Sequence, residues 1–155
     1  MTQDLTGQVA IVTGGSDGIG LATAALLVRR GATVVICGRR QEQLDIASAH
    51  IEAEGGTVEA VQLDVTDFPA FEALIQDVAA RHGRLDMLVN NASTLGPNPL
   101  ALLADTDCED LEHALAVNLV GPFRLTKAVI GSMLVRIQGI ADSVLPPDAK
   151  QLLSC

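Results

Sequence analysis

Aromatic residues are scarce in this chain, which has no Trp, no Tyr and three Phe among its 155 residues. Because 48% of the residues are still hydrophobic, the apolar content is mainly Val, Ile, Leu and Ala. That content is enough to bury the core of one domain of ordinary size. Together with 14 glycines, it favours an α/β protein whose strands are buried on both faces of a parallel sheet.

Basic residues are also few, since ten Lys and Arg stand against 19 Asp and Glu, which gives a net charge of −9. Binding to nucleic-acid phosphates requires clustered Lys and Arg, so we expect no nucleic-acid partner. Charged residues interrupt the apolar stretches before the ~18 residues that a membrane span requires. The N-terminal segment includes Asp4 and does not have the profile of a secretory signal. We therefore expect no membrane partner.

Cysteine pairs are absent, because Cys37, Cys108 and Cys155 are odd in number, far apart and without C-x-x-C spacing. This pattern indicates neither a disulfide framework nor a zinc site. The three histidines stand alone on predicted helices, without Cys or Asp partners at ligand spacing. We expect no metal site and a reducing compartment, which for this chain means a cytoplasmic location.

Short β-branched runs alternate with helical patterns as far as Val89, which predicts βαβ units and a parallel sheet. The expected strands are Val9–Thr13, Thr33–Cys37, Thr57–Leu63 and Met87–Asn90. Because parallel crossovers are right-handed, successive units should step across the sheet until the chain returns to the other side of the first strand.

Three helices are expected between these strands, each with a stripe of apolar residues at helical spacing. The stripes are Ile19, Ala22 and Leu26, then Leu44, Ala47 and Ile51, then Phe71, Leu74, Ile75 and Val78. Gly31, Gly55 and Gly83 follow the stripes, at the positions where a left-handed residue ends a helix.

The pattern changes after the fourth expected strand. A loop spans 93–105, and Thr106 with Glu109 three residues later predicts a capping box for a long helix. Beyond about Ser132 we expect no strand or helix. The sequence thus predicts a sheet domain over 1–135 and an atypical, poorly ordered tail over 136–155.

A glycine-rich run directly follows the first expected strand and opens the first expected helix. Glycines let the backbone approach a diphosphate closely, and a helix N-terminus directs N–H groups and partial positive charge at the anion. We therefore predict a nucleotide site. Its residues here are Gly14, Ser16, Asp17, Gly18, Ile19 and Gly20.

The spacing Thr-Gly-x-x-x-Gly-x-Gly in this run resembles the short-chain dehydrogenase/reductase family, over about Leu5 to Leu134. The resemblance implies a Rossmann-type fold, a three-layer doubly wound parallel sheet, incomplete here at its C-terminal side. It also implies an NAD(P)-dependent oxidoreductase that transfers hydride between the cofactor and a small carbonyl or alcohol substrate.

Three further motifs carry the same resemblance. Asp64-Val65 is similar to the family's adenine-contacting pair. Asn90-Asn91-Ala92 is similar to its Asn-Asn-Ala-Gly, with Ser93 in place of the glycine, so that Asn91 and Ala92 become cofactor-site residues. Asn118 is similar to the family's catalytic Asn, which helps to hold a water in a proton relay.

The residues at the end of the second expected strand indicate which cofactor, NADP or NAD, is preferred. Gly38 stands where NAD-preferring members of the family carry Asp, and Arg39 and Arg40 follow it. A guanidinium can bind a 2′-phosphate, so we favour NADP over NAD. Asp17 in the glycine-rich run counts against this preference, because NADP-preferring relatives often have a basic residue nearby.

Structural roles are open alternatives for several of these residues. Arg39 and Arg40 suit a solvated helix start that pairs with Glu42. Asp64 suits a cap on the turn that follows its strand, and Asn91 suits a turn.

Asn118 lies four residues before Pro122, which has no N–H to donate to the Asn118 carbonyl. A helix deformed at this point provides a mechanical basis for a relay that uses the carbonyl. The alternative is an Asn that only satisfies a helix kink. The family's Tyr-x-x-x-Lys pair, which protonates the developing alkoxide, has no counterpart in this chain.

Three interpretations follow. The first is a reductase by descent, present here in truncated or frame-shifted form and inactive. The second is a non-catalytic dinucleotide-binding or regulatory module, and the third is a non-functional fragment. In each case the fourth strand would be an open sheet edge, so we expect self-association through that edge and the helix Leu111–Leu134.

Overall fold

Four strands form one fully parallel sheet in the computed structural model, which describes residues 4–96 and 102–144. The strands are β1 (Val9–Thr13), β2 (Thr33–Gly38), β3 (Val58–Gln62) and β4 (Met87–Val89). Their order in the sheet is β3-β2-β1-β4. The chain therefore steps outward from β1 and then returns to its other side, as predicted.

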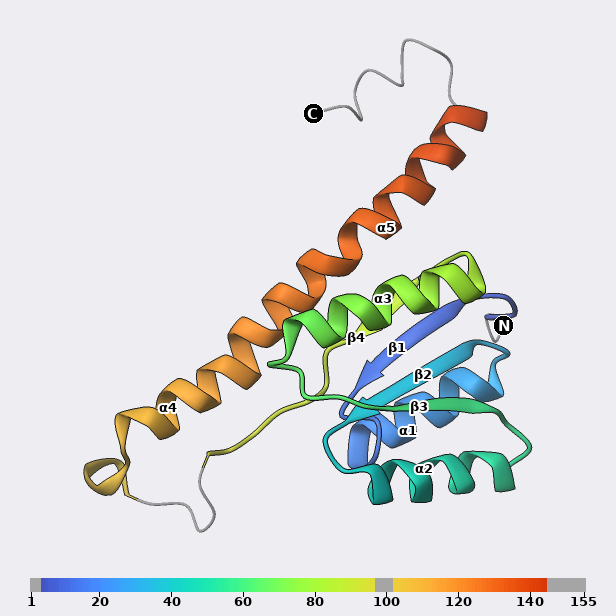
Figure 1. Cartoon of the computed structure of the whole chain (residues 1–155). Coiled ribbons are helices and arrows are strands. Elements are labelled where there is room, and N and C mark those ends of the chain that lie inside the picture. Colours follow the sequence, from blue (N-terminus) through green and yellow to red (C-terminus); the bar gives the residue numbers. More distant parts are fainter. Residues whose placement is uncertain (1–3, 97–101, 145–155) are drawn as a thin grey trace.

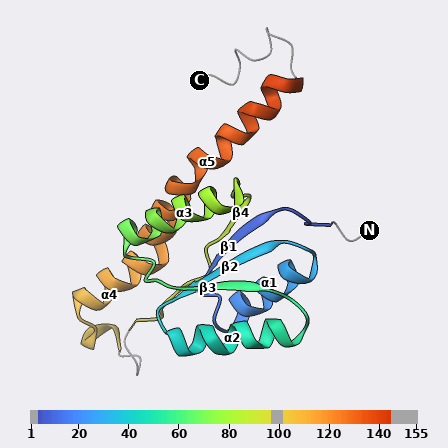
Figure 2. The same cartoon turned by 45° about the vertical axis from the view of Figure 1, so that its right-hand side comes forward.

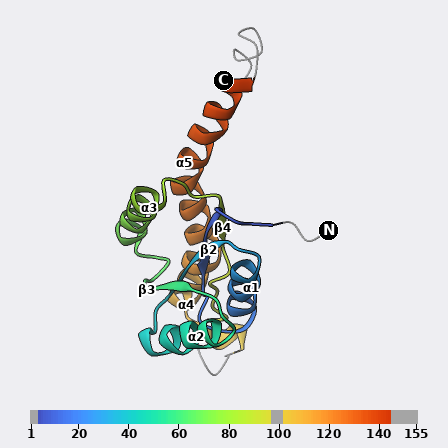
Figure 3. The same cartoon turned by 90° about the vertical axis from the view of Figure 1, so that its right-hand side faces the viewer.

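Helices cover both faces of the sheet (Figure 3). The helices α1 (Gly18–Arg29) and α2 (Gln41–Ala53) lie on one face, and α3 (Phe68–His82) lies on the other with the long C-terminal helix. Alternate residues of β1 enter the two cores, since Val9 and Ile11 face α3 while Ala10 and Val12 face α1 and α2. This is the expected three-layer, doubly wound α/β fold.

The predicted apolar stripes of α2 and α3 are both buried, but the stripe predicted for α1 is wrong. Ile19 is 80% exposed, Leu26 is 44% exposed and Ala22 is also exposed. Gly20 and Ala24 are buried instead. The first turn of α1 packs tightly beneath the glycine-rich loop, and this places a face of small residues against the sheet. That constraint overrides simple apolar periodicity.

The glycines expected to end the first three helices all adopt the left-handed conformation. Gly31, Gly55 and Gly83 have φ values of 92°, 84° and 68°. Only glycine adopts this conformation without steric cost, so the prediction of these helix ends is confirmed.

The helical region after β4 does not begin with the capping box that the sequence predicted. A 3-10 turn at Leu103–Asp105 precedes α4 (Cys108–Leu115), whose N-cap is Asp107. The Thr106 hydroxyl donates to the Leu102 carbonyl at 2.9 Å and so closes the 3-10 turn. The predicted capping box of Thr106 and Glu109 is therefore wrong.

The long helix is interrupted at the place that Pro122 indicated. After α4, a π-helical turn occupies Ala116–Val120, and α5 (Gly121–Val144) follows (Figure 1). The expectation of no helix beyond Ser132 is wrong, because α5 continues to Val144. Residues 133–144 include only one glycine and no proline, so nothing in them breaks a helix. The predicted tail is thus helical over 136–144, and its remainder, 145–155, lies outside the described residues.

The segment Cys108–Gly131 is long and apolar enough to cross a membrane, with a mean hydropathy of 1.2. Length and composition also describe a core helix of a globular fold. Val117, Leu125 and Val129 from this segment are buried in the core on the α3 face of the sheet. Figure 2 shows α5 passing alongside α3 and continuing beyond the sheet.

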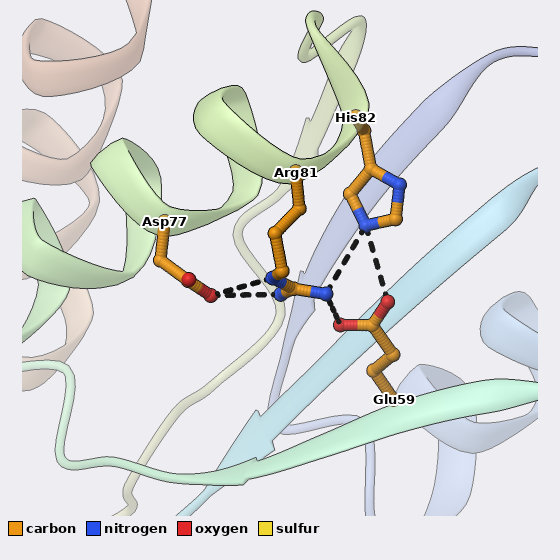
Figure 4. A network of polar contacts seen from close by, with 4 residues as sticks. All are labelled: Glu59, Asp77, Arg81 and His82. Atoms are coloured by element: carbon orange, nitrogen blue, oxygen red, sulfur yellow. Dashed lines mark hydrogen bonds and ion pairs between the residues drawn. The ribbon is translucent and has the colours of Figure 1, made fainter.

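A network of charged side chains joins the edge strand β3 to the end of α3 (Figure 4). The Arg81 guanidinium lies 2.7 Å from Glu59 and 2.8 Å from Asp77, and His82 Nε2 lies 3.1 Å from Glu59. The hydrogen bonds to Asp77 and Glu59 raise the pKa of Arg81. Exposed ion pairs add little stability, but charge on an edge strand discourages pairing with another strand.

A second polar connection fixes the start of β4 against β1. The Asp86 carboxylate, whose side chain is 8% exposed, accepts from the Val9 backbone N–H at 2.8 Å. It also accepts from two nitrogens of Arg84, at 2.7 and 2.9 Å. Because a buried carboxylate with several donors restricts both strands, Asp86 sets how the two strands enter the sheet.

Candidate cofactor-binding site

A groove of about 450 Å³ lies at the carboxyl ends of the strands, beside the point where β1 separates β2 from β4. Open α/β sheets bind ligands at such a reversal of strand order. The groove contains all but one of the residues predicted for the cofactor. They are Gly14, Ser16, Asp17, Gly18, Ile19, Arg39, Arg40, Asp64, Val65, Asn91 and Ala92.

Three glycines of the first βα turn have distinct roles. Gly14 has a φ of 64°, and a Cβ built on it would lie 2.9 Å from the Ala92 Cα. A Cβ on Gly20 would collide with the Gly14 carbonyl, so Gly20 packs beneath the turn and does not line the groove. Gly18 has a φ of 52°, and its missing Cβ would meet no atom within 4 Å. Its position therefore leaves open space beside the backbone in the groove.

The N-terminus of α1 lies at this space, because Gly18 and Ile19 both line the groove. Asp17 is the N-cap, and its carboxylate accepts from the Gly18 N–H at 2.7 Å. The first intrahelical bond runs from the Leu21 N–H to the Asp17 carbonyl, at 3.2 Å. Helix N–H groups before that bond have no helical acceptor and carry partial positive charge, which suits an anionic ligand.

Thr13 and Asn91 join the turn after β1 to the end of β4. The Thr13 hydroxyl donates to the Val89 carbonyl at 3.2 Å and accepts from the N–H groups of Asn91 and Ala92, at 3.0 and 3.1 Å. The Asn91 amide donates to the carbonyls of Thr13 and Gly14, both at 3.0 Å. Asn91 therefore fixes the shape of the glycine turn, a larger role than the turn former considered from sequence.

The sequence motifs included Thr13 and Ser93 but assigned neither of them a role in the site, and Val117 was not considered for one. Thr13 is 1% exposed. It is the one polar residue of an otherwise apolar strand, and that is the sequence signal that could have identified it. Ser93 lines the groove next to Ala92. Val117 reaches the groove from the π-helical turn, a contact that no local pattern indicates.

The end of β2 forms another part of the groove wall. Gly38, Arg39 and Arg40 all line it, and a Cβ on Gly38 would lie 3.4 Å from the Ser16 hydroxyl. Both arginines are exposed, and neither forms an ion pair with Glu42. Arg40 is the N-cap of α2, so the solvated helix start considered as the alternative is present, but the pairing with Glu42 is not.

Asp64 has the structural role considered as its alternative and also lines the groove. Its carboxylate accepts from the Thr66 N–H at 2.9 Å and from the Thr66 hydroxyl at 2.7 Å. Partial burial raises the pKa of the Asp64 carboxyl, but these hydrogen bonds and the charges of Arg39 and His113 outweigh it and hold the pKa below its usual value. Asp64 is thus a fixed negative charge at the groove.

Asn118 lies outside the groove, although its neighbour Val117 lines it. The Asn118 Oδ1 accepts from the Thr94 N–H at 2.9 Å, and its Nδ2 donates to the Thr94 carbonyl at 2.7 Å. Pro122 has no N–H, so the ordinary helical bond to the Asn118 carbonyl cannot form.

Neither the buried cysteine nor a metal-binding cluster marks a second reactive centre in the described part of the chain. Burial raises the pKa of the Cys37 thiol to about 12. Within residues 4–96 and 102–144, His, Cys, Asp and Glu side chains form no group of three or more that could hold a metal ion.

Known proteins resemble this chain over most of its length. The family model described as short chain dehydrogenase matches residues 8–141. The short chain dehydrogenase/reductase dpchG of Colletotrichum higginsianum is 37% identical over 130 residues, which cover 84% of this chain and 48% of that protein.

Two solved structures have the same fold. A metagenomic short-chain oxidoreductase in complex with NADP has a TM-score of 0.78 at 38% identity and is matched over 86% of this chain and 60% of that chain. An NAD⁺-bound xylitol dehydrogenase has a TM-score of 0.79 at 30% identity and is matched over 86% of this chain and 51% of that chain.

The matched part of each relative is shorter than the whole relative. It spans about half the length of curated relatives that it matches, at 48%, 46% and 44% of three of them. The family model nevertheless covers nearly all of the described residues, and the glycine turn, the Asp64 pair and the Asn91 segment form one groove. The chain therefore belongs to the short-chain dehydrogenase/reductase family.

Proposed function

We propose that this chain binds a nicotinamide dinucleotide in the groove, and that the protein's reaction is hydride transfer between NADP(H) and a small carbonyl or alcohol. The observation that carries the proposal is the open space beside Gly18 at the N-terminus of α1. A diphosphate requires close backbone approach and N–H donors, and both are present there.

The rest of the groove suits the two halves of such a ligand. With the diphosphate at the glycine turn, the adenosine half extends toward the ends of β2 and β3, beside Arg39 and Asp64. The other half extends toward Asn91 and Ser93, after β4. This assignment uses the groove on both sides of β1.

NADP is the cofactor that we favour. Gly38 leaves space beside the Ser16 hydroxyl, and the exposed Arg39 guanidinium lines the groove, where it can pair with a 2′-phosphate. One similar structure holds NADP and another holds NAD⁺, so the preference depends on these residues and not on the comparisons.

The chemistry divides between the cofactor and the protein. The bound dinucleotide would supply the hydride, while a protein group must deliver a proton to the developing alkoxide. We assign the Asn118 backbone carbonyl to the proton relay. The chain contains no tyrosine to act as the family's donor, so we propose that these 155 residues alone bind the cofactor without turnover. The same observation favours a second candidate, a dinucleotide-binding or regulatory module.

Self-association is the further part of the proposal. Large apolar side chains lie exposed along α4, the π-helical turn and α5. They are Leu111, Leu115, Leu119, Phe123 and Ile130, between 44% and 69% exposed. An apolar trough of about 420 Å³ also runs along the free side of β4, between α1 and α5. Exposed apolar surface of this kind favours pairing with a second copy of the chain.

The glycine turn is tested by replacing Gly18 with leucine. We expect Gly18→Leu to weaken NADPH binding about tenfold or more, because the side chain enters the space that the diphosphate needs. Fluorescence titration measures the affinity. Gly55→Leu is the matched control, since Gly55 also has positive φ and open space but lies away from the groove. Equal affinities in the two variants would contradict the site.

The cofactor preference is tested at Arg39. Arg39→Ala should weaken NADPH binding about ten- to a hundredfold, because a charge-assisted contact to the 2′-phosphate is lost. NADH binding should stay within about twofold, since NADH has no 2′-phosphate. Arg30→Ala is the control, because Arg30 is the C-cap of α1 and does not line the groove. A parallel loss for both cofactors would show that Arg39 does not read the 2′-phosphate.

Turnover is tested by following NADPH absorbance with the purified chain and a panel of small aldehydes and ketones. We expect NADPH to bind but no oxidation above the protein-free rate, since the proton donor is missing. A full-length family member in the same assay confirms that the conditions support reduction. Carbonyl reduction by these 155 residues would refute the proposed lack of turnover.

Association is tested by sedimentation at several protein concentrations. The chain should form a species larger than a monomer that dissociates on dilution. Phe123→Glu should shift it to monomer, because Phe123 is 69% exposed on the apolar face. Ile46→Glu places the same change on α2, where Ile46 is 58% exposed, and should have no effect. A wild-type monomer at every concentration would rule out self-association.

A further inference from the structure

A second groove, of about 420 Å³, lies between α3 and α5, which run alongside each other (Figure 2). Each helix contributes side chains three and four residues apart, which lie on the same helix face. They include Phe68, Phe71 and Glu72 from α3, and Arg124, Leu125 and Lys127 from α5. None of these residues lines the cofactor groove. The α3–α5 groove is therefore separate from the site proposed for the dinucleotide.

The floor of the α3–α5 groove is apolar. Phe71 and Leu125 are each 1% exposed and belong to the core on the α3 face of the sheet. Phe68 lines the same groove and is half-buried. Because closely packed core side chains cannot move outward without leaving a void behind them, this floor keeps its shape. It offers fixed apolar surface to a small organic group.

Two cations and one carboxylate surround this floor. Arg124, Lys127 and Glu72 all line the groove and are all exposed. The Arg124 guanidinium lies over the Phe68 ring, with its Cζ 4.1 Å from the ring centroid. The face of an aromatic ring attracts a cation, and a guanidinium does not lose its charge in proteins. Arg124 therefore places a permanent positive charge beside the apolar floor.

These charges have no ion-pair partners in the part of the chain that the structure describes. No ion pair there includes Arg124, Lys127 or Glu72, although the three side chains share one groove. Arg29 and Arg81, by contrast, are both paired with carboxylates. The two cations of the α3–α5 groove thus remain available to an anion from solution.

We propose that the α3–α5 groove binds a small organic monoanion. Its carboxylate lies at Arg124 and Lys127, and its apolar body lies on the floor. A guanidinium matches the geometry of a carboxylate. Glu72 repels an anion of higher charge, because two cations and one carboxylate leave a single net positive charge around the groove. The inference is independent of the proposed cofactor site.

The ligand class is tested with 4-phenylbutyrate, an aromatic monocarboxylate, by titration calorimetry of the purified chain. We expect saturable binding at one site per chain. The neutral amide, 4-phenylbutyramide, has the same shape but no charge, and should bind about tenfold more weakly. Inorganic phosphate has no apolar body and should not bind at the same concentrations. Equal affinities for the acid and the amide would overturn the proposal, and so would an absence of 4-phenylbutyrate binding.

Two variants with opposite expected effects test the location. Arg124→Gln should weaken 4-phenylbutyrate binding about five- to tenfold, because a charge-assisted contact is lost. Glu72→Gln should strengthen binding about two- to fivefold, because a like charge is removed. Arg30→Gln is the matched control, since Arg30 is exposed and lies outside the groove. It should bind as the wild type does. An equal loss in Arg30→Gln would indicate a general effect of net charge and contradict the site.

The neighbouring apolar face of α5 and the cofactor groove are the other places where the probe could bind. Phe123→Ala reduces that face without changing the α3–α5 groove, and should leave 4-phenylbutyrate binding unchanged. Saturating NADPH should also leave it unchanged. Loss of binding in either experiment would place the probe elsewhere and overturn the inference. A chain that binds 4-phenylbutyrate in this way but does not bind NADPH would overturn only the proposed function.

Discussion

The hydrogen bonds between Thr13 and the Asn91 segment are the constraint on which the site depends. They connect the last residue of β1 to the end of β4, at the place where the strand order reverses. The glycine turn starts at this junction, and its close contact with Ala92 leaves no room for side chains there. Because Thr13 is buried, losing its bonds would leave polar groups without partners in the core. The same hydrogen bonds thus stabilise the sheet and shape the groove.

The sequence predicted those elements whose burial follows from helical or strand periodicity alone. The faces of α2 and α3 and the sheet order are of this kind. Prediction failed where a local contact outweighed the pattern. Gly20 pulls the small-residue face of α1 inward, and the Thr106 hydroxyl closes a 3-10 turn in place of a capping box. Such contacts depend on the local backbone geometry, which cannot be predicted from the type of any single residue.

The candidate site shows the same division. Residues of the glycine turn and the strand ends were predictable, because each follows a strand at a position where the chain leaves the sheet. The contribution of Val117 was not predictable, since it depends on a π-helical turn far along the chain. The partner of Asn118 was equally hidden, because Thr94 lies in a loop without periodicity. Interactions between segments that are distant in the sequence became visible only in the three-dimensional structure.

The two sides of the sheet differ in what they offer to another strand. The outer side of β3 is marked by the ionic contacts of Glu59 with Arg81 and His82. The outer side of β4 instead adjoins Val129 and Met133 of α5 in an apolar trough. Two sheets joined at β4 would both face outward with their charged β3 sides, and neither would accept a third. If two copies pair at β4 as proposed, the charges beside β3 would therefore favour a closed pair over an open-ended fibre.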